Sequence, residues 1–146
     1  MADYTTHFST ILDVRTADNV DRALVLYAAL ASEIEADDGT DLNFVLSPER
    51  DEPAFAGRTT LWIHDGDYGD PGHVITFVQR CAESFGLDGR WGFVWGHDCS
   101  KPRLDGFGGG AVVIDLGTGR SETIDVSDWL DDRVAGRVAF GSDVGE

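Results

Sequence analysis

The chain has 146 residues, of which 42% are hydrophobic, so its length predicts a single domain that buries its own core. Its 27 acidic and 11 basic residues give a formal net charge of −16, which argues against direct binding to nucleic acid or to an anionic membrane. No apolar run approaches the ~20 residues that span a bilayer, no signal peptide begins the chain, and two cysteines make no disulfide framework. These features predict a reduced, cytoplasmic protein.

The first elements follow from hydrophobic periodicity. Residues 7–14 alternate and contain β-branched side chains, which favours a strand. A helix follows, started by Thr16 or Asp18 and ended by Gly39. Its apolar positions recur at helical spacing: Val20, Ala23, Leu24, Tyr27, Leu30, Ala31 and Ile34.

Two strands and a second helix come next. We expect strands at residues 42–47 and 59–65, separated by a loop in which Pro48 and Pro53 block regular pairing. The second helix has Asp70 as its N-cap, Pro71 at its first position and Gly86 after its last turn.

The last third predicts more strands and a short helix. Residues 90–97 form a strand in which Trp91, Phe93 and Trp95 point to one face. After a connection, residues 110–126 form two strands around the turn Gly117–Thr118–Gly119. A short terminal helix follows, with Ser127 as the expected cap.

This order is β-α-β-β-α-β followed by a β-hairpin and a short helix. It predicts an α+β fold of the ferredoxin-like type, with a mainly antiparallel sheet and both helices on one face. Residues 1–135 make the domain and residues 136–146 a C-terminal tail.

The connection HDCSKPRLDGFGGG (97–110) is unusual because it holds the only lysine, Lys101. Its glycines precede a strand and lack the Walker pattern, which argues against a phosphate loop. We expect the glycines to admit Trp91 or Trp95, and we expect Lys101 and Arg103 to tether the connection to nearby carboxylates.

Two alternatives assign chemistry to these residues. In an enzyme, His97, Asp98 and Cys99 would form the site, because a histidine two residues away can generate a reactive thiolate. In a metal-binding module, His64, Asp67 and His73 would be the ligands, although the loop around them lacks the EF-hand pattern. The leading interpretation includes neither catalytic residues nor a metal or other cofactor.

A basic patch is a further alternative. Lys101 and Arg103, with Arg90 or Arg120, form the densest positive cluster, and an aromatic sheet face can stack single-stranded bases. The chain lacks the aromatic RNA-binding signature of that family, and its net charge opposes the interaction.

The run CSKPRLDGFGGGAVVIDLGTG, followed by Trp129 and Leu130, resembles a pattern in small uncharacterised proteins of bacterial phages and plasmids. The similarity covers the last third to half of the chain. It implies a mobile-element context and brings no activity with it.

The sequence therefore predicts a non-enzymatic interaction protein, a monomer or small homo-oligomer. Its acidic surface would bind and block a basic, nucleic-acid-binding protein, as anti-CRISPR and immunity-type inhibitors do. The candidate contacts are the acidic residues Asp37, Asp38, Asp41, Asp65, Asp67 and Asp70, together with Lys101 and Arg103.

Overall fold

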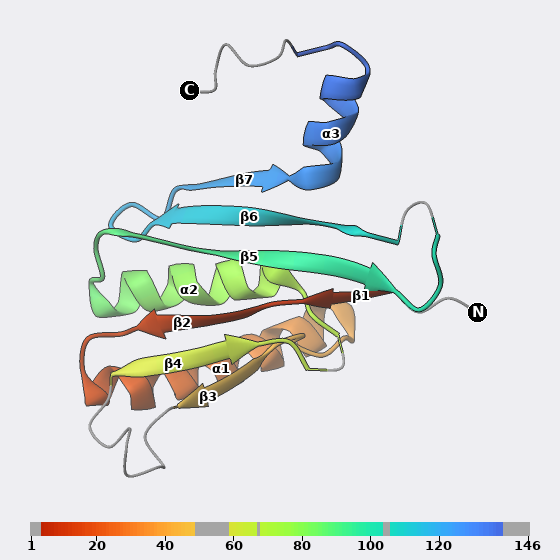
Figure 1. Ribbon diagram of the computed structural model, residues 1–146. Helices are drawn as coiled ribbons and strands as arrows, with labels where there is room; N and C mark the ends of the chain where they lie inside the picture. Colours follow the sequence, from red (N-terminus) through yellow and green to blue (C-terminus); the bar gives the residue numbers. More distant parts are fainter. Residues whose placement is uncertain (1–3, 49–58, 67, 104–105, 139–146) are drawn as a thin grey trace.

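The computed structural model describes residues 4–48, 59–66, 68–103 and 106–138 (Figure 1). Within these ranges the chain is an α+β protein with two antiparallel sheets and three helices. None of the described helices is long and apolar enough to cross a membrane.

The smaller sheet has three strands in the order β2-β4-β3. They are β2 (Ser9–Asp13), β4 (Thr60–His64) and β3 (Val45–Pro48). The larger sheet has four strands in the order β1-β5-β6-β7. They are β1 (Tyr4–His7), β5 (Arg90–Cys99), β6 (Gly108–Asp115) and β7 (Ser121–Asp125).

The N-terminal strand passes from one sheet to the other. The sequence predicts one strand over residues 7–14, but the structure has β1 paired with β5 and β2 paired with β4, with only Phe8 between them. Side chains keep alternating through this point, because Phe8 is buried while its neighbours are exposed. The indole N–H of Trp91 also donates a hydrogen bond to the carbonyl of Ile11, 2.9 Å away, which joins the sheets.

Helices α1 (Ala17–Asp38) and α2 (Pro71–Phe85) lie behind the strands in Figure 1. The hydroxyl of Thr16 caps α1 by accepting from the backbone N–H of Asn19, and Asp70 caps α2 in the same way at Gly72. Gly39 and Gly86 end the helices with left-handed φ angles of 69° and 65°. These predicted helix ends are confirmed.

The core lies between the helices and one face of the strands. Side chains buried there include Leu12, Leu61, Ile63, Phe77 and Ile114, and none of these exposes more than 1% of its surface. Trp91, Phe93 and Trp95 contact one another in a row on this covered side, as their spacing predicts. None of the helices in the described ranges covers the opposite side of the same strands (Figure 1).

Two predictions about the C-terminal third are wrong in detail. Strand β5 continues to Cys99 instead of ending at residue 97, because β1 supplies it with a pairing partner along that length. The terminal helix α3 (Val126–Val134) is capped by Asp125, not Ser127, because the Asp125 carboxylate accepts from the backbone N–H of Asp128 at 3.0 Å.

The glycine-rich start of β6 does admit an aromatic ring. A β carbon added to Gly110 would lie 2.6 Å from Cζ2 of Trp95, so only glycine leaves room for that indole. The tryptophan therefore fixes which residue can occupy this position of the neighbouring strand.

Candidate functional site

The residues His97, Asp98 and Cys99 do not form one cluster. They end strand β5, where alternation places Asp98 on the open side and its two neighbours on the covered side. The Nδ1 atom of His97 is hydrogen-bonded to the hydroxyl of Thr6, with 2.7 Å between the two atoms. Asp98 is therefore not positioned to orient His97 as a base for Cys99.

Cys99 is half-buried under the connection that follows it. The backbone N–H of Gly106 donates to the carbonyl of Arg103, which turns the chain back towards the strand. A β carbon at Gly106 would lie 2.6 Å from the β carbon of Cys99, so the turn packs directly on this cysteine. Cys81, the second cysteine, is fully buried in α2, and burial raises the pKa of its thiol to about 12.

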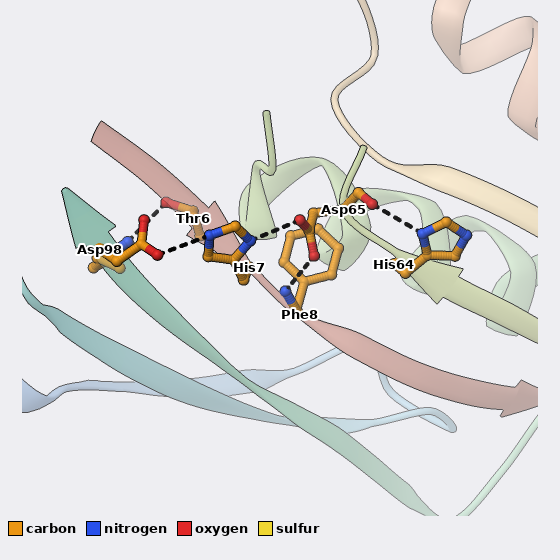
Figure 2. A network of polar contacts seen from close by, with 7 residues as sticks. Thr6, His7, Phe8, His64, Asp65 and Asp98 are labelled. Atoms are coloured by element: carbon orange, nitrogen blue, oxygen red, sulfur yellow. Dashed lines mark hydrogen bonds and ion pairs between the residues drawn. The ribbon is translucent and has the colours of Figure 1, made fainter. Parts of the chain in front are cut away.

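The principal polar network on the open side centres on His7, which sequence analysis did not single out (Figure 2). Nδ1 of His7 lies 2.9 Å from a carboxylate oxygen of Asp65, and Nε2 lies 3.2 Å from one of Asp98. We call these three side chains the His7 bridge. They connect β1, the segment after β4 and the end of β5.

Both ring nitrogens of His7 face carboxylates, which accept hydrogen bonds but cannot donate them when ionised. The protonated ring satisfies both partners, whereas the neutral ring satisfies one. The hydrogen bond that His7 donates to the Asp65 carboxylate is the largest cause that raises the pKa of His7 above 6.5. Half of the His7 side chain is exposed, so water screens the interaction.

Asp65 is held by backbone as well as by His7. Its carboxylate accepts from the backbone N–H of Phe8 at 2.9 Å, and its own N–H donates to the Phe8 carbonyl at 3.1 Å. Burial acts to raise the pKa of Asp65, but the hydrogen bonds from Phe8 and His7 outweigh burial and lower it. The partners of His7 lie 58 and 91 residues away, so no local pattern indicates the bridge.

The candidate metal ligands are engaged elsewhere or lie outside the described residues. Nδ1 of His64 donates to the carbonyl of Asp65 at 2.9 Å, and its ring stacks on Trp62. Nδ1 of His73 accepts from the backbone N–H of Asn43, while its Nε2 lies 3.4 Å from Asp70. Asp67 lies outside the described residues, within which no group of three or more metal-ligating side chains is found.

The acidic residues predicted to contact a partner fall into two groups. Asp65 belongs to the His7 bridge and Asp70 caps α2, so both already have structural partners. Asp37 lies in the last turn of α1 and Asp41 just beyond it, and both are exposed. Asp38 is the last residue of α1, and its side chain lies outside the described part.

The basic residues do not gather into one patch. Lys101 and Arg103 are exposed in the connection after β5, and the described residues provide neither with an ion-pair partner. Arg90 begins the same strand, and together with Arg120 it lines a surface hollow at the opposite end. Ten residues of strand separate the two groups by about 30 Å.

The uncovered side of the sheets presents apolar side chains in its centre. Its large exposed members come from both sheets: Ile11, Trp62, Val94, Val113 and Ile124. We call this surface the open face. Its charged residues sit at strand ends or on the edge strand, and they are Asp13, Arg90, Asp98, Asp115 and Glu122, together with His7 and Asp65 of the His7 bridge.

Comparison with family models, with curated proteins and with solved structures finds no match to this chain. The site must therefore be interpreted from its own geometry.

Proposed function

We propose that this protein works by binding a basic protein partner, and that the C-terminal end of α1 is the contact. The observation that carries this proposal is the negative charge there, for which the described part of the chain provides no ion-pair partner. Asp37 and Asp41 are exposed, and no basic residue occupies the last turn of α1. A helix C-terminus is itself negative, so these carboxylates add to an unfavourable field that a cationic surface relieves.

The whole molecule reinforces this local field. A net charge of −16 attracts a basic protein from a distance and accelerates association. Nucleic-acid-binding proteins carry such basic surfaces, so an acidic domain that covers one also blocks it. Together with the sequence resemblance to phage and plasmid proteins, this supports an inhibitor of the anti-CRISPR or immunity type.

Salt dependence and matched charge variants test the proposal. We expect the tagged protein to capture a stoichiometric basic partner from host lysate at low salt and to release it at high salt. The double variant Asp37→Asn/Asp41→Asn should lose most of this binding. Asp128→Asn/Asp131→Asn, which removes the same charge from α3, should retain more of it. Partner binding that does not change with salt would contradict the proposed contact, and so would an equal loss of binding in the two double variants.

We also propose that the elements from β1 to β5 form a ferredoxin-like sandwich. If β1 and β2 are counted as one strand, the pairings give the order β5-β1/β2-β4-β3, and every pair is antiparallel. The split β-α-β order and the two helices on one side support this assignment. Cross-strand nuclear Overhauser effects from residues on both sides of Phe8 to β4 and β5 would test it.

A further inference from the structure

We propose that the open face is a homodimer interface, on which a second copy of this chain packs with two-fold symmetry. The inference is independent of the proposed function, because it concerns a neutral surface and not the acidic end of α1. Four properties of the open face support it: its charge, its relief, its area and its apolar content.

Charge is the first property. The chain is strongly acidic, yet the centre of the open face, around Ile11, Val94 and Ala111, carries no formal charge. Depletion of charged residues is the compositional mark of an interface core. A basic partner would gain nothing from this neutral area, whereas a second copy presents the same neutral, apolar surface to it.

Relief is the second property. Val94 exposes 70% of its surface and stands between Gly92 and Gly96, where no side chain rises from the sheet. Next to it is an open hollow lined by Phe8, Ser9, Trp95 and Gly96, with His7 and Asp65 of the His7 bridge forming a polar wall and Val94 itself at its rim. A projection beside a hollow is self-complementary in a two-fold interface, because each copy inserts its projection into the hollow of the other.

The backbone requires glycine at two positions of this surface. A β carbon at Gly92 would lie 2.3 Å from the carbonyl oxygen of Val112, and one at Gly109 would lie 2.4 Å from that of Trp95. Neither position accepts a larger residue without a backbone shift. The backbone therefore keeps larger side chains out of these two positions near Val94.

Area is the third property. Strands lie about 4.8 Å apart and rise about 3.3 Å per residue, so the larger sheet with β2 and β4 offers roughly 600 Å² of projected surface. Accessible surface exceeds its flat projection, and a stable interface uses about 800 Å² from each partner. The open face is large enough for one dimer contact.

The apolar content is the fourth property. Trp62, Val113 and Ile124 surround the central projection and are each 40–50% exposed. A large exposed apolar area is typical of an interaction site in a soluble protein. Two copies that each carry a net charge of −16 repel one another, so the dimer should strengthen as salt screens this repulsion.

Sedimentation of the purified protein at two salt concentrations tests this inference. We expect a monomer–dimer equilibrium that shifts towards dimer when salt rises from about 0.05 M to about 0.5 M, which shortens the screening length. Val94→Asp should raise the dissociation constant of the dimer roughly 100-fold, because each interface would bury two unpaired carboxylates.

Val25→Asp is the matched control. Val25 is 69% exposed, almost the same as Val94, but it lies on α1 and not on the open face. This variant should dimerise like the wild type. Thermal unfolding checks that both variants fold, and Ile124→Asp replaces Val94→Asp if that variant does not.

A monomer at every concentration and salt would overturn the inference, and so would a dimer that Val25→Asp disrupts and Val94→Asp does not. The two proposals fail separately. Salt weakens the binding of a basic partner and strengthens the dimer, while Asp37→Asn/Asp41→Asn leaves the open face unchanged.

Discussion

The two faces of the same strands differ sharply in burial. Phe93 is 7% exposed and its neighbour Val94 is 70% exposed, and the pair Val112 and Val113 shows the same contrast at 4% and 41%. Both faces are apolar, so hydrophobicity alone does not decide which one the helices cover. On the face that α1 and α2 cover, Phe93 of the sheet and Phe77 of α2 both belong to the buried core.

The contrast in burial gives apolar residues different roles on the two faces. On the covered face it stabilises the fold, whereas on the open face it is available for contact with another molecule. Substitutions on the two faces should therefore separate stability from association.

The largest expected effect is on the covered face. Phe93→Ala should lower the free energy of unfolding by about 3–5 kcal/mol, because it removes a buried ring that packs against Phe8 and Trp95. Val94→Ala, one residue further, should change it by less than about 0.5 kcal/mol. Urea unfolding at low salt and low protein concentration measures both values. Similar losses in the two variants would mean that Val94 is also part of the core.

A pair of glycines gives the next effect. Gly110→Ala should destabilise the fold by about 1–3 kcal/mol, because the new methyl group overlaps the Trp95 ring and the Ile124 carbonyl. Gly96→Ala meets no atom closer than 4.0 Å and should change stability by less than about 0.5 kcal/mol. Thermal unfolding with tryptophan fluorescence as the signal distinguishes the two. A stable Gly110→Ala variant would contradict the packing of the indole on that glycine.

The smallest effect concerns the His7 bridge, at the margin of the open face. The pKa of His7 is raised in the folded protein, so its contribution to stability is present below pH 6.5 and is lost as the pH rises through the folded value. An exposed ion pair contributes about 0.2–1 kcal/mol, and His7→Gln should remove this part of the pH dependence.

The control for this prediction is His64→Gln. His64 donates to a backbone carbonyl and not to a carboxylate, so its substitution removes an imidazole without breaking the His7 bridge. Urea unfolding between about pH 5.5 and pH 8 measures both variants. Identical pH profiles for wild type and His7→Gln would show that the bridge adds no pH-dependent stability.

Local signals predicted the local features of this fold. Thr16, Asp70, Gly39 and Gly86 mark the helix ends because caps and left-handed positions depend on one or two residues. The sequence also predicted that Trp91, Phe93 and Trp95 share a face, because the alternation of side chains along a strand depends only on neighbouring residues.

Features that depend on distant partners were missed. Strand β5 extends to Cys99 only because Tyr4 pairs with it, and His7 acquires its role from Asp65 and Asp98. The error at Ser127 has a local cause: Asp125 and Ser127, two residues apart, both suit an N-cap, and the structure uses the earlier one.

The long separation between β1 and β5 has a consequence for synthesis on the ribosome. The smaller sheet can pair once residue 64 has emerged, but β1 has no partner until residues 96–99 are available. At 5–20 residues per second, the 91 residues between His7 and Asp98 take roughly 5–18 s to translate. During that interval the nascent chain displays an unpaired strand, which is the type of segment that chaperones recognise.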